Sequence, residues 1–286
     1  MVKVGIIGGS GLYEMEGLQD VNKVSLDTPF GKPSSEFVIA RLKDKEVVFL
    51  PRHGKGHVIS PTEINYRANI YGMKSLGVER IISLTACGSL KEEIKPLDFV
   101  VPDQFVDRTN QARKYTFFEE GIVAHISFAH PVCSEVADVL LQSARQAGAS
   151  VHFPGTYVNM EGPAFSTLAE SNLYRSWGMD IIGMTNLMEA RLAREAEICY
   201  ATLAAVTDYD CWHPEHDNVT VDAILDNLRR NVSNSKKILK IAVEALGRER
   251  SCCCKDALKY SIATNPGLIP KETKEKLRII IGKYIK

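Results

Sequence analysis

Short runs of aliphatic and β-branched residues alternate with helical patterns along most of this chain. Several runs are nearly continuous in apolar residues, which is typical of strands buried on both faces: 2–7, 47–50, 80–84, 99–101, 181–184 and 201–206. Helical patterns lie between or after them: 62–76, capped by Thr62, 135–147, capped by Ser134, 187–198, 221–246 and 271–284. The alternation predicts an α/β fold with a central mixed, largely parallel β-sheet flanked by helices.

One main domain is expected. The 286 residues fit one large α/β domain, and a hydrophobic content of 45% is ordinary for globular proteins. The pattern breaks at 248–255. We therefore expect a domain over 1–247 and a C-terminal arm over 248–286, which packs on the same domain or on a neighbouring subunit.

Charge and hydropathy argue against several classes of protein. Lys and Arg total 35, as do Asp and Glu, so the formal charge is zero and the basic footprint of a nucleic-acid-binding protein is absent. No stretch reaches the roughly 20 apolar residues that a membrane helix needs. The first residues lack the apolar run of a signal peptide. We expect a cytoplasmic protein that binds neither nucleic acid nor membrane.

The seven cysteines show no familiar metal-binding spacing. Cys252, Cys253 and Cys254 are consecutive, and Cys87, Cys133, Cys199 and Cys211 are scattered. No CxxC pair occurs and no His lies at zinc-finger spacing, so no metal site is expected.

Small, polar and glycine residues follow the predicted strands, at the edge where open α/β sheets bind ligands. Gly8-Gly9-Ser10-Gly11 can form an anion-binding nest, although a plain tight turn is the alternative. Arg52 and His53 follow the second strand and suit phosphate, unless Arg52 makes a surface ion pair.

Two further strand ends carry similar residues. Thr85-Ala86-Cys87-Gly88 would let a ligand reach backbone amides, and Cys87 there is expected to be a packed thiol rather than a nucleophile. Met184-Thr185 offers a soft apolar side chain beside a hydroxyl group.

Asp208 and Asp210 follow the last predicted strand. In an extended backbone their side chains point to the same side, and mutual repulsion raises one pKa so that one carboxyl can remain protonated. Such a pair can donate to a ring nitrogen and accept from an exocyclic amine. Alternatives are a solvated acidic turn, glycoside hydrolysis or a hard metal ion.

Six segments occur in a characteristic order: GIIGGSGLY (5–13), PRHG (51–54), TACGSL (85–90), DQFVDRT (103–109), EGPAFS (161–166) and TDYDCW (207–212). Together they resemble the 5′-methylthioadenosine phosphorylases, a group within the purine nucleoside phosphorylase family. The similarity spans about residues 2–246 and weakens after Arg248.

The resemblance implies roles for individual residues. Phosphate would be bound by Ser10 (often Thr in the family), Arg52, His53, Thr85, the amide of Ala86, and Thr185. The nucleoside would meet Met184, Phe165, Asp208 and Asp210, with Asp208 as the catalytic proton donor to N7. Ser166 and Val221 match positions that determine substrate choice. His125 matches a histidine that contributes to the pocket of a neighbouring subunit, and an ordinary surface histidine is the alternative.

The implied reaction is phosphorolysis of 5′-methylthioadenosine to adenine and 5-methylthioribose 1-phosphate, with adenosine as a further substrate and a role in purine and methionine salvage. Inorganic phosphate is the co-substrate and no cofactor is expected. A carboxylate at Asp210 favours a 6-amino group over a 6-oxo group. Alternatives are a 6-oxopurine nucleoside phosphorylase, a hydrolytic nucleosidase and a non-catalytic purine-binding protein.

The resemblance also bears on assembly and on the cysteines. It implies a homotrimer or homohexamer with the active site near a subunit boundary, and a 5′ pocket for which 262–268 are candidates. The 252–254 run resembles the CxC element of some thermophilic members. Cys133 and Cys199 are expected to lie close enough to bridge, whereas reduced thiols are an equally good interpretation of Cys252 and Cys254.

Overall fold

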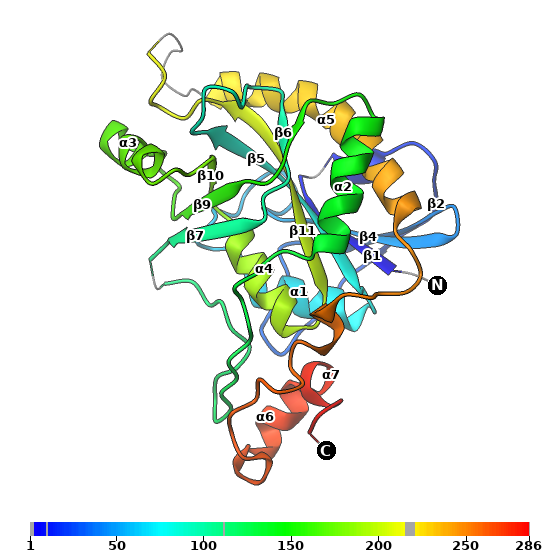
Figure 1. Ribbon diagram of the computed structural model, residues 1–286. Helices are drawn as coiled ribbons and strands as arrows, with labels where there is room; N and C mark the ends of the chain where they lie inside the picture. Colours follow the sequence, from blue (N-terminus) through cyan, green and yellow to red (C-terminus); the bar gives the residue numbers. More distant parts are fainter. Residues whose placement is uncertain (1–2, 10, 111, 215–220, 286) are drawn as a thin grey trace.

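The computed structural model describes residues 3–9, 11–110, 112–214 and 221–285, without the side chains of 13, 221–226 and 228 (Figure 1). Its centre is one mixed sheet with a main path β2-β3-β4-β1-β5-β10-β9-β7; β11 joins β5 to β6, and β6 pairs with β8. The strands are β1 Lys3–Gly8, β2 Leu18–Val24, β3 Phe37–Leu42, β4 Lys45–Pro51, β5 Arg80–Ser89, β6 Phe99–Val100, β7 Gln104–Arg108, β8 Val151–His152, β9 Thr156–Met160, β10 Ile181–Gly183 and β11 Cys199–Asp208.

The middle of the sheet is parallel. β1 pairs in parallel with β4 and β5, and β5 pairs in parallel with β11. Antiparallel strands are added around this centre: β3 to β4, β2 to β3, β10 to β5 and β6 to β11. The predicted mixed, largely parallel α/β sheet is confirmed.

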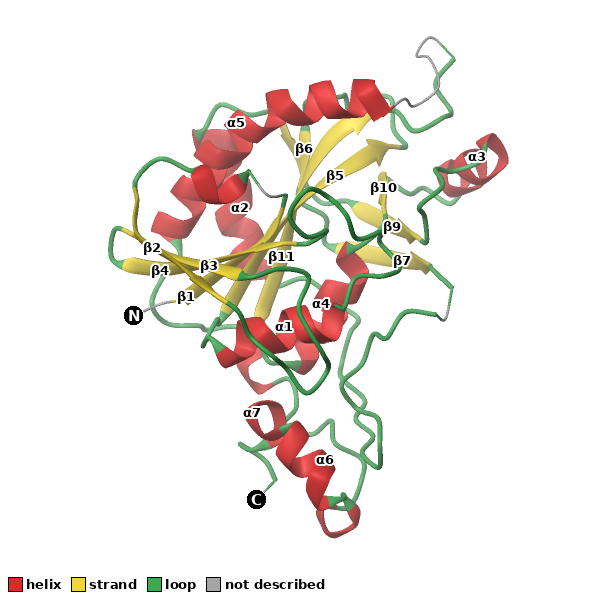
Figure 2. Cartoon of the chain, turned by 180° about the vertical axis from the view of Figure 1, so that it is seen from behind, coloured by secondary structure: helices red, strands yellow, loops and turns green. Residues whose placement is uncertain are grey.

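Helices cover both faces of the sheet (Figures 1 and 2). On one face α2 and α5 pack over β11; on the other α4 packs over β11 and β5, and α1 packs beside α4. Alternate residues along β1 explain this arrangement, because Val4 and Ile6 join the first apolar cluster whereas Ile7 joins the second. The helices are α1 Tyr66–Ser75, α2 Ser134–Gln146, α3 Leu168–Ser176, α4 Asn186–Glu195, α5 Val221–Ala245, α6 Lys271–Lys276 and α7 Arg278–Ile281.

The C-terminal arm packs against the α1/α4 face. Leu258, Ile269 and Ile280 belong to the same buried cluster as that face. The arm also pairs with the loop that precedes α2: the His125 N–H donates to Ser261 O at 2.8 Å, and a bridge joins Ala124 to Ile262. Figures 1 and 2 show this loop beside the arm, below the sheet.

Several element boundaries differ from the sequence-based expectation. Thr62 does not cap α1, because its hydroxyl donates to Glu161 at 2.5 Å; Asn65 is the cap and accepts from the Ala68 N–H at 3.1 Å. The helix expected over 271–284 is two short helices, with Leu277 between them at φ −100°. The sequence patterns also did not predict β2, whose residues are mainly exposed, or the short strands β7, β8 and β9. None of these four strands contains a long apolar run.

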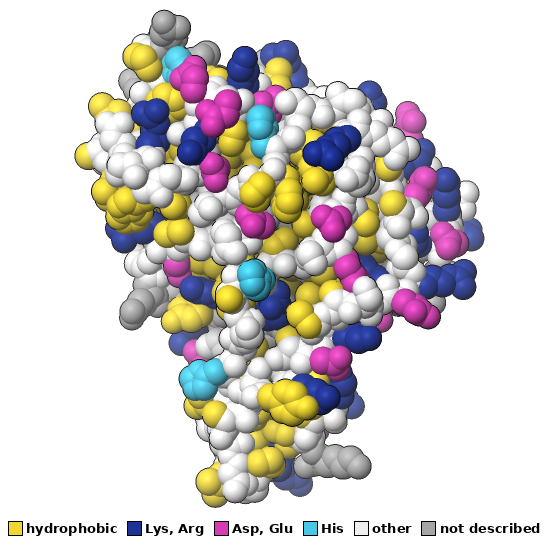
Figure 3. All heavy atoms as spheres, viewed as in Figure 1, with side chains coloured by type: hydrophobic (Ala, Val, Ile, Leu, Met, Phe, Trp, Pro, Cys, Tyr) yellow, Lys and Arg dark blue, Asp and Glu magenta, His cyan; other side chains and the backbone are white. Residues whose placement is uncertain are grey.

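Basic and acidic side chains are interspersed on the face seen in Figure 3, in keeping with equal totals of 35 each. None of the described helices combines the length and the apolar character needed to cross a membrane.

We expect Gly72→Ala to destabilise the fold. A Cβ at this α1 position would lie 2.4 Å from Cζ of Phe37, a ring buried under the helix. Overpacking of this kind costs about 1–3 kcal/mol. The measurement is urea unfolding, with Gly247→Ala as control, since a Cβ there would meet its nearest atom at 3.9 Å. Equal free energies of unfolding for the two variants would contradict this description of the interface between α1 and β3.

Candidate functional site

The carboxyl ends of the parallel strands meet as predicted. Gly8 and Pro51 are paired at the ends of β1 and β4, and the Arg52 N–H donates to Gly8 O at 3.0 Å. A Cβ on Gly8 would lie 3.3 Å from Leu84, the residue before Thr85. Three of the predicted segments are therefore adjacent. Ser10 lies outside the described residues.

Arg52 makes a buried ion pair with Glu189, a residue of α4 that sequence reasoning missed. Its Nε donates to Glu189 at 2.5 Å, and the two side chains are 3% and 2% exposed. Burial alone would lower the pKa of Arg52, but the charge and hydrogen bonds of Glu189 outweigh this and the pKa rises. The alternative of a surface ion pair for Arg52 is therefore wrong, because the pair is buried. Glu189 could have been noticed as an acid within the otherwise apolar run Leu187-Met188-Glu189-Ala190.

The remaining Arg52 donors are largely used within the protein. Nη1 donates to Leu84 O at 3.1 Å, and Nη2 donates to Ser83 Oγ at 2.6 Å and to Glu189. A guanidinium has five N–H donors, so these three contacts and the contact of Nε leave one N–H, on Nη1, without a partner among the described residues.

His53 is a neutral imidazole at neutral pH. Burial, followed by the charge of Arg52, lowers its pKa to about 4. Its Nδ1 lies 2.8 Å from Ile59 O, which can only accept, so Nδ1 carries the proton and Nε2 is an acceptor. The ring stacks on His57 at 4.2 Å between centroids. With this tautomer, Nε2 is free to accept a hydrogen bond from a ligand but not to donate one.

Thr85, Ala86 and Thr185 lie around a second group of buried polar side chains. The Thr85 hydroxyl donates to Ala86 O at 3.1 Å and also hydrogen bonds Tyr157. The Tyr157 and Thr185 hydroxyls both donate to Asn186 Oδ1 at 3.2 Å. The geometry therefore brings the predicted Thr85 and Thr185 together through Tyr157 and Asn186, two residues that sequence reasoning missed.

Met184 is held from both sides. Its carbonyl accepts from Nη1 of buried Arg113 at 2.5 Å, and Arg113 also pairs with Glu161 at 2.8 Å. Its sulfur lies against Gly162, where an added Cβ would be 2.4 Å away. Because Gly162 also has φ +70°, this glycine allows the chain to pass close to Met184.

Asp208 and Asp210 both adjoin Gly88 at the end of β5. A Cβ on Gly88 would lie 2.9 Å from Asp208 Oδ1 and 3.4 Å from Asp210 Cβ. The extended backbone assumed from the sequence is wrong, since Asp210 has φ +53°. That turn directs the Asp210 N–H to Asp208 Oδ1 at 2.8 Å, while the Thr207 hydroxyl donates to Oδ2 at 2.7 Å.

Both carboxyl groups have raised pKa values. For Asp208 the main cause is burial, opposed by its two hydrogen bonds and assisted by the charge of Asp210. For Asp210 burial is again the main cause, opposed by hydrogen bonds that include one from Ser166. The pair is thus not a solvated acidic turn, and each acid holds a proton more readily than an exposed aspartate does.

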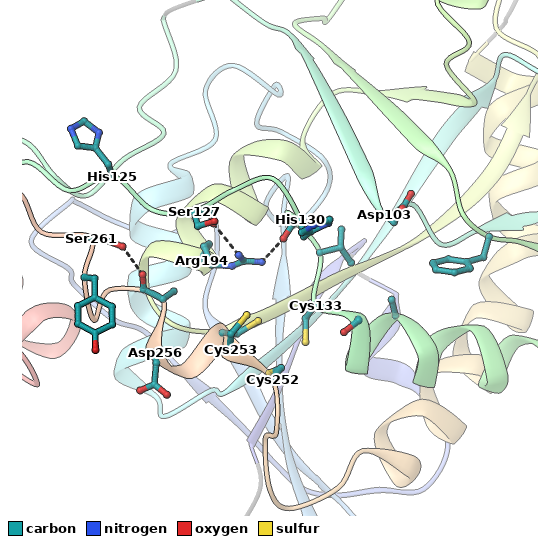
Figure 4. A pocket seen from close by; sticks show the side chains of 17 residues that line it. Asp103, His125, Ser127, His130, Cys133, Arg194, Cys252, Cys253, Asp256 and Ser261 are labelled. Atoms are coloured by element: carbon teal, nitrogen blue, oxygen red, sulfur yellow. Dashed lines mark hydrogen bonds between the residues drawn. The ribbon is translucent and has the colours of Figure 1, made fainter.

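The other predicted residues are dispersed. Ser166 is buried beside Asp210, and Phe165 is 45% exposed. Val221 begins α5, but its side chain lies outside the described part. His125 does not join this site: it lines a separate cavity of about 820 Å³ that shares none of the other predicted site residues (Figure 4).

The two groups of residues are connected by one strand. Thr85 adjoins the Arg52 and Thr185 side, and Gly88 adjoins the acidic pair. Gly88 comes three positions after Thr85, which is about 10 Å along the strand at 3.3 Å per residue. This arrangement can hold an anion at one end and a hydrogen-bonding ring at the other.

Comparisons with known proteins give a consistent result. The family model described as "Phosphorylase superfamily" matches residues 3–244. The S-methyl-5'-thioadenosine phosphorylase of Geobacter sulfurreducens is 60% identical over 282 residues, covering 99% of each chain. That of Koribacter versatilis is 59% identical and covers 99% of this chain and 96% of its own length.

Solved structures are similar as well. A methylthioadenosine phosphorylase from an antarctic soil metagenomic library has a TM-score of 0.93 at 47% identity, covering 98% of each chain. A Schistosoma mansoni adenosine/methylthioadenosine phosphorylase variant, solved with methylthioadenosine, has a TM-score of 0.84 at 40% identity, covering 91% of this chain and 96% of its own.

Glu189→Gln is expected to be strongly destabilising. The substitution leaves the Arg52 charge buried and unpaired, which costs about 3–5 kcal/mol. Urea unfolding measures the effect. The control is Glu275→Gln, which removes an ion pair with Arg278 between side chains 76% and 70% exposed and should cost at most about 1 kcal/mol. Similar losses in the two variants would show that Arg52 does not depend on Glu189.

His53 makes stability depend on pH. Its folded pKa of about 4 lies below the ordinary 6.5, so between these values the unfolded chain binds a proton that the folded chain does not. Its contribution is complete above about pH 6.5 and is lost as the pH falls towards 4. The free energy of unfolding of His53→Gln should therefore decline less than that of the wild type over this window. The variant of exposed His125, His125→Gln, is the control, and equal slopes for His53→Gln and the wild type would contradict the assignment.

Proposed function

Because this chain belongs to the phosphorylase superfamily, among the S-methyl-5'-thioadenosine phosphorylases, we infer that it cleaves 5′-methylthioadenosine by phosphorolysis. The products are adenine and 5-methylthioribose 1-phosphate. The enzyme is a pentosyltransferase that moves the sugar from the base to phosphate. Related structures that hold methylthioadenosine or adenine support this reaction over the 6-oxopurine alternative.

We assign the residue roles from the positions of two polar groups that lie against β5. One end of the strand adjoins the buried guanidinium of Arg52, and the other adjoins the carboxyls of Asp208 and Asp210. The separation of about 10 Å suits a nucleoside with phosphate at its C1′ side. We therefore assign phosphate to the first end and the purine to the second.

Phosphate is bound by Ser10, Arg52, His53, Thr85, Thr185 and the Ala86 amide. Arg52 offers its one remaining N–H in a direction that Glu189 determines, so its main contribution is orientation. His53, with Nε2 as acceptor, takes the hydrogen of a protonated phosphate oxygen. The hydroxyl groups of the two threonines supply further donors.

The nucleoside lies between these ends, with the ribose against Met184 and the base near Phe165. As the bond breaks, positive charge develops on the ribose and negative charge on the purine. Phosphate stabilises the first and attacks C1′. Asp208 donates a proton to N7. Because its pKa is raised, its carboxyl group is protonated more often than that of an exposed aspartate.

Asp210 determines the preference for an aminopurine. Its carboxylate accepts from the 6-amino group, whereas a 6-oxo lone pair would face the same negative charge. Ser166, which is buried beside Asp210, limits the positions of that carboxylate and in this way influences substrate choice. Val221 is proposed as a second such position. Adenosine has the same base and is a further proposed substrate.

A homotrimer, or a hexamer made of two trimers, is proposed as the working form. His125 is exposed on the loop beside the C-terminal arm and lies away from the site of its own chain. Tyr260 and Leu268 on the arm are 89% and 76% exposed, as expected of apolar residues that a second copy covers. We propose that His125 completes the 5′ pocket of a neighbouring subunit and that the enzyme acts in the cytoplasm, in purine and methionine salvage. The reaction needs phosphate as co-substrate and no cofactor.

The test is adenine release from 5′-methylthioadenosine with and without phosphate. Release should require phosphate, since phosphate is the attacking group. Asp208→Asn should lower kcat by about 10²–10⁴-fold, the usual contribution of a positioned acid, and leave the KM for phosphate unchanged.

Asp138→Asn is the matched control, because Asp138 is exposed on α2. Equal rates without phosphate would indicate hydrolysis, and an unchanged kcat in Asp208→Asn would remove Asp208 from the role of acid.

A further inference from the structure

Four cysteines from three segments that are distant in sequence lie close together on the α2/α5 face of the sheet. Cys133 precedes α2, Cys199 begins β11, and Cys252 and Cys254 lie at the start of the arm. Their Sγ atoms all lie within 4.8 Å of one another. The expected proximity of Cys133 and Cys199 is confirmed. The expectation that no metal site exists rested on local spacing, which cannot detect a cluster made by three separate segments.

The sulfur positions suit one tetrahedral ion. Zn²⁺ lies about 2.3 Å from each thiolate, so tetrahedral ligands are about 3.8 Å apart. The contact between Cys199 and Cys252 is 3.3 Å, and all four sulfurs meet the 4.8 Å limit. All four cysteines are free thiols, and three are buried while Cys252 is half-buried. A soft set of four sulfurs selects zinc over hard cations.

We propose that Cys133, Cys199, Cys252 and Cys254 bind one Zn²⁺ ion in a structural tetrathiolate site. Four protein ligands close the coordination shell, so no position remains for a reacting water or substrate. The site therefore acts independently of the phosphorolysis proposed above.

The position of Cys133 favours a thiolate. Cys133 is the N-cap residue of the 13-residue helix α2, where the helix dipole stabilises negative charge. Its backbone N–H donates to Tyr200 O at 2.8 Å, which fixes it beside β11. Arg80 is paired in register with Cys199 and so shares its face of the sheet. Arg80 is 2% exposed and adds positive charge on this face of the sheet, where its Nη1 lies 3.5 Å from Glu79 and its Nη2 donates to Glu249 O at 2.7 Å.

Zinc would join the arm to the body of the enzyme. The ligands come from α2, β11 and the arm, and the arm in turn pairs with the loop that carries His125. The large cavity of Figure 4 is lined by Cys133, Cys252 and Cys254, so it gives an ion or a chelator a path to the cluster. Cys253, the neighbouring thiol, is exposed and lies outside the cluster.

Metal analysis of the full chain tests the proposal. The protein is purified with a thiol reductant and without a chelator, and zinc is measured by plasma mass spectrometry. About one zinc per chain is expected. Cys254→Ser and Cys199→Ser should lose most of that zinc, whereas the matched control Cys253→Ser should retain it.

A second measurement on the wild-type chain avoids dependence on variants that fail to fold. Replacement of zinc by Co²⁺ should give thiolate-to-cobalt charge-transfer bands and the intense d–d bands of a tetrahedral ion. A wild-type chain without zinc, with two disulfides by mass spectrometry, or with no cobalt–thiolate bands would overturn the proposal. Loss of zinc in Cys253→Ser equal to that in Cys254→Ser would overturn the ligand assignment.

Discussion

The buried ion pair between Arg52 and Glu189 is the constraint around which this site is arranged. Removing two charges from water is expensive, and their attraction offsets that cost only when the geometry is good and other polar groups complete the hydrogen bonds. Here β5 supplies Ser83 and Leu84 O, and Tyr200 of β11 donates to Glu189 at 2.9 Å. Strands β5 and β11, helix α4 and the turn after β4 therefore cannot shift independently.

β5 connects this charge pair to the acidic pair. It is bordered by β1 and β11 in parallel and by β10 in the opposite direction. Gly88 has no side chain, so Asp208 and Asp210 can lie directly against the strand. The same strand thus determines both the position of the proposed phosphate site and that of the proposed proton donor. A bulge in β11 between Val206 and Asp208 adjusts the second of these positions.

Much of the site could be predicted from sequence because its residues follow strand ends, and parallel strands bring their carboxyl ends to one edge. Arg52, Thr85, Thr185 and Asp208 were all found this way. Their supporting residues were not: Tyr157 and Asn186 lie within a strand and a helix without a local signature, and Glu189 is marked only as an acid in an otherwise apolar run. The protonation of His53 also required tertiary information, since it depends on Ile59 O and the neighbouring guanidinium.

By itself the sequence determined the α/β class, the order of the main strands and helices, and the strand-end motifs, because apolar periodicity and turn residues act locally. Only the tertiary structure decided which buried charges are paired, that Asp210 leaves the extended conformation, and that four cysteines form one cluster. The cysteines show the reason most simply. Cys133, Cys199 and the pair Cys252 and Cys254 come from three segments far apart along the chain, and only the packing of α2, β11 and the arm brings their sulfur atoms within 4.8 Å of one another.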